Sequence, residues 1–297
     1  MNDHRKYLQP KVVAQLENIE LIARLVVEGF IIGLHRSPYH GFSVEFAEHR
    51  QYRPGDEIRN IDWKAFARTD KYYIKQFEEE TNLRCVIALD ASASMKYASK
   101  GQISKYEYGC YLAASLAYLL IKQRDAVGIA LYDTNLHTYL PPRSKHSYIN
   151  EILKVIDTTQ PSNETETAKS LDVLAERITR RGLVIVISDF FDNPATVTKA
   201  LSHFRHKKHE VLAFQVLDPR EIDFKFGRAA TFKDIETSEE MVTQPYQIQK
   251  SYSKAMKDFI TGLKRDCRNN NIDYHLTDTS EPFDKALREY LTKRKKM

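Results

Sequence analysis

Cys85-Val86-Ile87-Ala88-Leu89-Asp90-Ala91-Ser92-Ala93-Ser94 is the stretch that decides the fold. Its first five residues form an apolar run with β-branched members, which predicts a buried strand. One carboxylate and two hydroxyls, on Asp90, Ser92 and Ser94, leave the end of that strand. Side chains two residues apart converge where a chain turns out of a strand, and oxygen ligands of this kind suit a hard cation such as Mg²⁺. The same string also suits the N-cap of a following helix, so both interpretations stay open at this point.

The composition is that of an ordinary globular protein. The chain has 297 residues, of which 42% are hydrophobic and 29% charged, which is enough for one large α/β domain or for one domain with a smaller appendage. The net charge is +5, and positive and negative residues are interspersed along the chain, so a nucleic-acid partner is not expected. The basic run 293–296 is interpreted as a solvated end. Three widely spaced cysteines and the lack of a signal peptide or integral membrane segment predict a cytoplasmic location.

Strand and helix patterns alternate along most of the chain. Four apolar runs predict strands, at 85–89, 127–132, 183–188 and 211–217, and helical periodicity separates them at 103–122, 145–157, 168–180 and 195–207. This alternation predicts an α/β fold with a doubly wound, mostly parallel sheet covered on both faces. Asp133-Thr134-Asn135 predicts a hairpin turn into an antiparallel edge strand, which Pro141-Pro142 is expected to end.

The flanking segments divide the chain into two regions. Residues 1–80 are predicted to form an N-terminal helix, at 11–34, and an Arg/Asp-rich extension that packs on the α/β domain. Residues 81–297 are predicted to form that domain, with an irregular insertion near 219–245 that includes a strand at 230–235. A helix at 246–270, a strand at 272–276 and a closing helix at 282–293 complete it.

Strand ends are where a doubly wound sheet binds its ligands, at the point where the strand order reverses. If the order is 3-2-1-4-5-6, the strand that ends at Asp90 lies beside the one that ends at Ser188-Asp189, and two carboxylates face one crevice. Thr165, at the head of the next helix, is placed to add a hydroxyl. Helix capping is the alternative: Thr165 or Thr167 for its own helix, and Ser188-Asp189 for the helix after Pro194.

The spacing Asp90-x-Ser92-x-Ser94, followed by Thr165 and then by Asp189, resembles a von Willebrand factor A-type domain with a metal-ion-dependent adhesion site. The resemblance implies Mg²⁺ or Mn²⁺ with Ser92 and Ser94 as direct ligands, Thr165 as a direct or water-mediated ligand, and Asp90 and Asp189 acting mainly through water. Two departures stand out. Glu164 occupies the position before the threonine where such domains carry glycine, and Phe190 follows Asp189 where glycine is frequent.

The preceding segment carries a second resemblance. Its members are Glu45-Phe46, Arg50, Tyr52, Pro54-Gly55-Asp56, Arg59, Ile61-Asp62-Trp63, Ala67-Arg68-Thr69 and Phe77-Glu78. They resemble the signature of domain-of-unknown-function family 58, a largely bacterial family whose members commonly occur beside MoxR-type AAA+ ATPases, which implies such an ATPase as partner. From the residues alone, the alternating arginines and aspartates predict an ion-pair lattice that fastens the extension to the α/β domain, with Trp63 as apolar anchor. A docking surface for another protein is the alternative.

No catalytic motif is recognisable, because phosphate-binding loops, nucleophile elbows and His-Glu-x-x-His are absent from the sequence. We therefore expect no enzyme but a cytosolic interaction protein, whose metal is completed by an acidic residue of a partner, in the role of adaptor or co-chaperone of a MoxR-type ATPase. Two alternatives remain. One is a metal-dependent hydrolase in which Asp90 or Asp189 orients water. The other is a metal-free scaffold with a vestigial site.

Overall fold

A six-stranded sheet forms the centre of the computed structural model, which describes residues 10–13, 21–27, 49–51, 63–75, 83–161, 166–226, 230–233, 240–243 and 245–295. The strand order is β10-β7-β6-β3-β4-β5. The strands are β3 (Arg84–Asp90), β4 (Ala126–Tyr132), β5 (Leu136–Arg143), β6 (Leu183–Ser188), β7 (Glu210–Leu217) and β10 (Asp273–Asp278). All neighbours are parallel except β4 and β5, which form the predicted antiparallel hairpin.

The order of the sheet agrees with the prediction. Numbered in chain order, the six strands read 3-2-1-4-5-6, so the winding reverses between β3 and β6. Their register pairs Leu89 with Ile187, which brings the last residue of β3, Asp90, level with the end of β6. The two strand ends predicted to meet therefore lie side by side at the carboxyl edge of the sheet.

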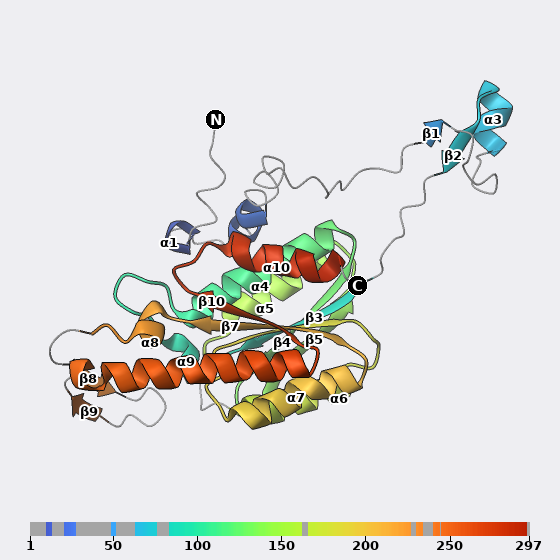
Figure 1. The fold of residues 1–297 in the computed structure, drawn as a ribbon. Coiled ribbons are helices and arrows are strands. Elements are labelled where there is room, and N and C mark those ends of the chain that lie inside the picture. Colours follow the sequence, from blue (N-terminus) through green and yellow to red (C-terminus); the bar gives the residue numbers. More distant parts are fainter. Residues whose placement is uncertain are drawn as a thin grey trace.

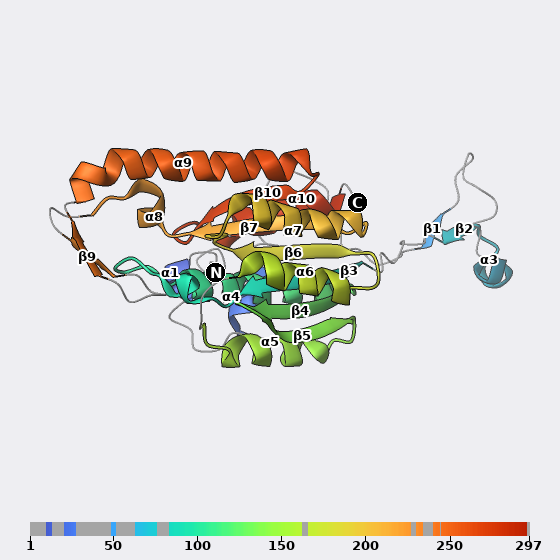
Figure 2. The ribbon, with the colours of Figure 1, turned by 90° about the horizontal axis from the view of Figure 1, so that it is seen from below.

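Helices cover both faces of the sheet, as Figure 1 shows. One face carries α4 (Lys105–Lys122), α5 (Tyr148–Thr158) and α10 (Phe283–Lys295), and the other carries α6 (Thr167–Arg177), α7 (Pro194–His206) and α9 (Pro245–Asn269). Along β3 the side chains alternate, so that Cys85, Ile87 and Leu89 face the first set of helices while Val86 and Ala88 face the second. Figure 2 shows α9 at the edge of the second layer, beside α7 and near β10. None of the described helices is both long and apolar enough to cross a membrane.

The N-terminal helix is described in two parts, α1 (Pro10–Val13) and residues 21–27. Ile22, Ala23, Val26 and Val27 are at most 1% exposed and belong to the same apolar cluster as β3 and α4. The described turns of the predicted helix are therefore part of the core, and the remainder of 11–34 lies outside the described residues.

The described part of the extension forms a small unit of its own. In it, β1 (His49–Gln51) pairs with β2 (Tyr73–Lys75), α3 (Trp63–Thr69) lies between them in the chain, and the group stands apart from the sheet in Figures 1 and 2. Trp63, the predicted anchor, is 56% exposed and contacts Phe66, whose ring stacks on Tyr72 at a centroid distance of 4.4 Å. The aromatic rings thus pack within the extension. Most of the predicted ion-pair lattice, from Arg53 to Asp62, lies outside the described residues.

Pro141 and Pro142 do not end β5, contrary to the expectation from sequence, because the strand continues to Arg143. N–H groups of consecutive strand residues point to opposite sides, so each side of β5 loses one donor. The outer side needs no donor, since β5 is the edge strand. On the inner side the register with β4 is irregular next to Gly128, where an added Cβ would lie 2.3 Å from the Leu140 carbonyl oxygen. A bulge and a glycine together accommodate the prolines.

Gly128→Ala should therefore lower the free energy of unfolding by about 2 kcal/mol, because backbone atoms of β5 occupy the space that the methyl group needs. Gly262→Ala is the matched control. No atom lies within 4 Å of a Cβ at that position, which is in α9, so the same change should raise the stability by up to about 1 kcal/mol. Urea denaturation measures the free energy of unfolding of both variants, and a destabilisation of equal size at both positions would contradict the steric explanation.

The insertion after β7 contains regular structure. It begins with α8 (Pro219–Asp223), which Asp218 caps, and continues with the antiparallel pair β8 (Ala230–Lys233) and β9 (Glu240–Thr243). The predicted strand at 230–235 is thus present as β8. The capping box at Asp218 makes α8 begin immediately after the end of β7, beside the strand ends that carry the candidate site.

Candidate metal centre

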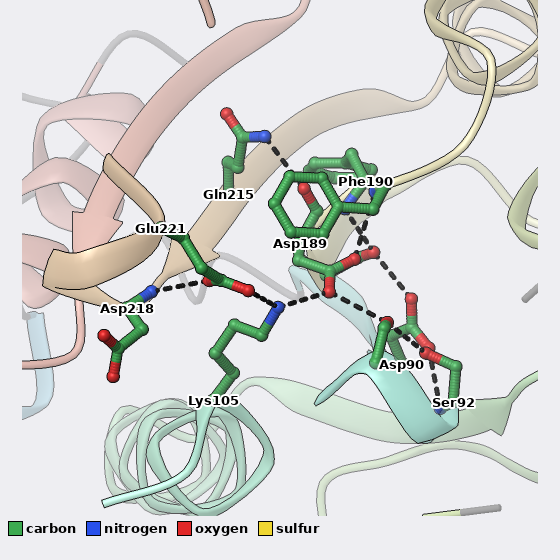
Figure 3. A network of polar contacts seen from close by, with 11 residues as sticks. Asp90, Ser92, Lys105, Asp189, Phe190, Gln215, Asp218 and Glu221 are labelled. Atoms are coloured by element: carbon green, nitrogen blue, oxygen red, sulfur yellow. Dashed lines mark hydrogen bonds and ion pairs between the residues drawn. The ribbon is translucent and has the colours of Figure 1, made fainter. Parts of the chain in front are cut away.

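Asp90 occupies the end of β3 with both carboxylate oxygens engaged (Figure 3). Its Oδ1 accepts a hydrogen bond from the backbone N–H of Ser92 at 2.9 Å, and its Oδ2 accepts one from the Ser188 hydroxyl at 2.6 Å. The side chain is fully buried. These two bonds fix the carboxylate between the ends of β3 and β6.

Asp189 is joined to the serines of the Asp-x-Ser-x-Ser string. The Ser94 hydroxyl donates to Asp189 Oδ2 at 2.9 Å, and the Oγ atoms of Ser92 and Ser94 lie 3.1 Å apart. The backbone N–H of Phe191 donates to Asp189 Oδ1. Four of the five predicted metal ligands, Asp90, Ser92, Ser94 and Asp189, therefore form one cluster. The fifth, Thr165, lies outside the described residues, as does Glu164.

The capping alternatives can be compared with the observed helix starts. Ser92 precedes a short 3₁₀ turn at Ala93–Lys96, but its side chain makes no capping bond. Asn193, and not Ser188 or Asp189, caps α7. Thr167 is the first residue of α6, and its buried hydroxyl has no hydrogen-bond partner among the residues the structure describes. The serines and Asp189 are thus available to the cluster and are not used as helix caps.

Lys105 and Glu221 are members of the site that the sequence analysis missed. The ammonium group of Lys105 lies 2.7 Å from Asp189 Oδ2 and 2.7 Å from Glu221 Oε1, and its side chain is completely buried. The Phe191 ring centroid is 4.6 Å from the same nitrogen. Glu221 in turn accepts the backbone N–H of Asp218. Lys105 therefore links the candidate metal ligands to the first turn of α8, as Figure 3 shows.

A weak sequence signal for Lys105 was present. It is the first residue of α4, directly after the N-cap Ser104, where the helix dipole disfavours a positive charge. A lysine at that position needs a compensating carboxylate nearby. Which carboxylates supply it was not visible from sequence, because Asp189 and Glu221 are 84 and 116 residues away.

Negative charge exceeds positive charge in this network. Asp90, Asp189 and Asp218 are fully buried and Glu221 nearly so, whereas Lys105 is the one ammonium group in contact with them among the described residues. Burial and the neighbouring charge of Asp189 raise the pKa of Asp90 to about 7, against the opposing effect of the hydrogen bonds from Ser188 and Ser92. Burial alone would lower the pKa of Lys105, but Asp189 and Glu221 outweigh it and raise that pKa above its usual value. The ammonium group is therefore charged and leaves an excess of carboxylates.

The residues present fit a hard divalent cation. The donor atoms are carboxylate and hydroxyl oxygens, which Mg²⁺ and Mn²⁺ prefer, and the charge excess is of the sign that a cation would neutralise. The Tyr132 hydroxyl is buried beside Asp90 and Ser188. Ser170 donates to the Asp133 carbonyl, which holds the head of α6 at the end of β4 beside this site. His, Cys, Asp and Glu of the described residues do not by themselves form a group of three or more that could hold a metal ion.

Phe190 explains one departure from the adhesion-site pattern. Its φ is +55°, in the left-handed region, which is why glycine is frequent at the corresponding position. A side chain there costs about 1–2 kcal/mol. The Phe190 N–H donates to the Ser188 hydroxyl, and its ring is fully buried, so packing and a hydrogen bond hold the turn that presents Asp189.

A family model described as "Protein of unknown function DUF58" matches residues 48–259. The chain belongs to the DUF58 family. The resemblance inferred from the Arg/Tyr/Pro-Gly-Asp string is thereby confirmed, and the matched region of this DUF58 chain includes β3, β6 and all four clustered ligands.

Relatives of this DUF58 chain occur in mycobacteria. Uncharacterized protein Mb1516 of Mycobacterium bovis is 28% identical over 231 residues, which cover 77% of this chain and 72% of the relative. Uncharacterized protein MAV169 of Mycobacterium avium is 30% identical over 125 residues, covering 40% and 71%. Among solved structures, conserved hypothetical protein BatB of Bacteroides thetaiotaomicron aligns with a TM-score of 0.47 at 18% identity, over 72% of this chain and 98% of that chain. An aerotolerance-related membrane protein of Bacteroides fragilis gives 0.48 at 18%, over 70% and 98%.

Proposed function

We propose that this DUF58 chain is a divalent-metal-dependent protein-interaction module of the von Willebrand factor A type, which acts as adaptor of a MoxR-type AAA+ ATPase in the cytoplasm. The observation that carries the proposal is the chain of contacts from Ser92 through Ser94 to Asp189, which joins the ends of β3 and β6 opposite the carboxylate of Asp90. The ATPase as partner rests on the family resemblance of the sequence.

Each residue has a defined part in this proposal. Ser92 and Ser94 supply direct hydroxyl ligands, Asp90 and Asp189 act mainly through water, and Thr165 remains a predicted ligand. When bound, Mg²⁺ or Mn²⁺ supplies an open coordination position that an acidic side chain of the partner completes. The protein's own contribution is to hold the oxygens in place: Ser188 and the Ser92 N–H orient Asp90, while Lys105 and the Phe191 N–H orient Asp189.

Ser92→Ala should weaken Mg²⁺ and Mn²⁺ binding at least about tenfold, because it removes a direct ligand and leaves the carboxylates in place. Ser115→Ala is the matched control. Ser115 is an equally buried serine, but its hydroxyl donates to the Tyr111 carbonyl within α4. Isothermal titration of the full chain with each metal measures the affinity, and equal affinities for wild type and Ser92→Ala would contradict the ligand assignment.

The partner is tested separately with the same variants. Purified MoxR-type ATPase should be retained by the immobilised wild type and by Ser115→Ala in Mg²⁺, and it should be lost in chelator and with Ser92→Ala. Metal binding without retention of the ATPase would leave the metal site standing and exclude this partner.

A metal-free scaffold is the second candidate, and Lys105 favours it. Its ammonium group already lies 2.7 Å from Asp189, so that one of the two ligand carboxylates has a charge partner within the chain. This candidate predicts no saturable binding of Mg²⁺ or Mn²⁺ and retention of the ATPase that is the same with and without chelator. The titration described above distinguishes the two functions directly.

A further inference from the structure

A cavity with mixed polar and apolar lining lies at the opposite edge of the sheet. It has a volume of about 170 Å³, and Arg84, Gly182 and His209, at the starts of β3, β6 and β7, form part of its lining. The end of α6 and the loop after it contribute Arg177 and Arg180. Asp90 is the last residue of β3 and Arg84 the first, so about 20 Å of strand separates the cavity from the candidate metal centre.

Three guanidinium groups line this cavity without a carboxylate to balance them. Arg84 donates to the Pro142 carbonyl over 3.4 Å, and within the described part of the chain the side chains of Arg177 and Arg180 make no hydrogen bond or ion pair. No aspartate or glutamate of the described residues belongs to the lining. Three like charges around one opening create a positive potential that favours an anion between them.

Glu176 and Glu210, which adjoin the cavity residues Arg177 and His209 in sequence, are already engaged with other cations. Glu176 lies 2.6 Å from Lys207 Nζ and 3.0 Å from His203 Nε2. Glu210 lies 2.9 Å from the Arg205 guanidinium and 2.6 Å from Lys293 Nζ. These pairs tie α6 to α7 and α10 to β7, so neither carboxylate is available to neutralise the arginines of the cavity.

His209 adds a polar atom that lacks a partner. The side chain is 1% exposed, and its Nδ1 has no hydrogen-bond partner among the described residues. Burial lowers the pKa of this imidazole, against the effect of the Ile178 and Gly182 carbonyls, so the ring is neutral near pH 7. A neutral imidazole carries one N–H donor, for which the Ile178 and Gly182 carbonyls compete, so the arginines supply most of the donors in this cavity.

We propose that this cavity binds a phosphate group, either as free inorganic phosphate or as part of a small phosphorylated molecule. A phosphate carries up to two negative charges and three or four acceptor oxygens, and arginine binds it through paired N–H donors. The volume of about 170 Å³ exceeds the share of about 30 Å³ that one water takes in the liquid, so a phosphate with a few further atoms fits. The site shares no residue with the metal centre, and its test is independent of the proposed function.

Arg177→Gln and Arg180→Gln test the site, and Arg181→Gln is the matched control. Arg177, Arg180 and Arg181 are all exposed, so that loss of folding is not expected, but Arg181 does not line the cavity. Inorganic phosphate is titrated into the full chain by calorimetry at constant ionic strength, with chloride as the replaced anion. We expect saturable binding to wild type, at least about tenfold weaker binding to each cavity variant, and binding to Arg181→Gln within about twofold of wild type.

Glycerol 3-phosphate in a second titration distinguishes the two sources of the phosphate group. Tighter binding of the ester than of inorganic phosphate supports a phosphorylated small molecule, and tighter binding of inorganic phosphate supports the free ion. The proposal is overturned if wild type shows no saturable binding of either compound. It is also overturned if Arg181→Gln weakens binding as much as Arg177→Gln, because the effect would then be general charge screening.

Discussion

Lys105→Met should lower the free energy of unfolding by about 3–5 kcal/mol in the presence of chelator at pH 8. The substitution keeps most of the side-chain volume but removes the ammonium group, and it leaves Asp189 and Glu221 buried without their charge partner. Breaking a buried ion pair on one side is costly because the remaining charge has lost its solvent and gains nothing in return. Urea denaturation of the full chain measures the effect.

Lys169→Met is the control for the loss of a lysine. Lys169 pairs with Glu166 on the surface, where both side chains are more than half exposed, so its removal should change the stability little. Saturating Mg²⁺ should restore part of the stability of Lys105→Met, because Asp189 is then free to take part in binding the cation. A loss of stability as small as that of Lys169→Met would show that Lys105 is not needed to balance the carboxylates.

Asp90→Asn should raise the free energy of unfolding in chelator, by up to about 4 kcal/mol above pH 7. Burial and the charge of Asp189 raise the pKa of Asp90 from 3.8 to about 7 in the folded chain. A raised pKa means that the folded state holds its proton more tightly than the unfolded state. The stabilisation that protonated Asp90 gives the folded state is therefore complete below about pH 4, and it is lost as the pH rises through 7. The amide is neutral at every pH and avoids that loss.

The pH series separates this effect from general changes in packing. Wild type in chelator should lose stability between pH 4 and pH 7 relative to Asp90→Asn, and Asp157→Asn, at an exposed position of α5, should follow wild type. In saturating Mg²⁺ wild type should be more stable than Asp90→Asn, because wild type keeps the carboxylate and the variant does not. A variant that is less stable than wild type in chelator at pH 8 would contradict the assigned cause.

The sheet could be predicted from the sequence for a specific physical reason. Parallel strands covered on both faces are continuous apolar runs, and 85–89, 127–132, 183–188 and 211–217 all became strands of one sheet. The order 3-2-1-4-5-6 was only assumed in the sequence analysis, as one that a doubly wound sheet adopts, and the structure has it. The error at Pro141-Pro142 arose because the sequence does not show the register shift opposite Gly128 that lets an edge strand continue through two prolines. The packing of the extension on the α/β domain stays a prediction, and its described aromatic rings contact one another.

The part of the site that comes from residues directly after strands could be predicted from the sequence. Asp90, Ser92, Ser94 and Asp189 converge because β3 and β6 are neighbours, which the strand order predicts. Ser188 was visible only as the neighbour of Asp189, although it holds Asp90 in place. Lys105 and Glu221 were not predicted, because they come from the start of a helix and from the insertion, and only the folded chain brings them together. Thr165 remains a prediction.

The two prolines of β5 also determine how the sheet meets other molecules. Of two consecutive residues in an extended strand, one points its backbone nitrogen outward, so either Pro141 or Pro142 removes a donor from the exposed margin of the sheet. A strand from another molecule that approached this margin would find a break in the ladder that it needs in order to pair. The edge that lies farthest from β10 is therefore protected against the extension of the sheet from one molecule into the next.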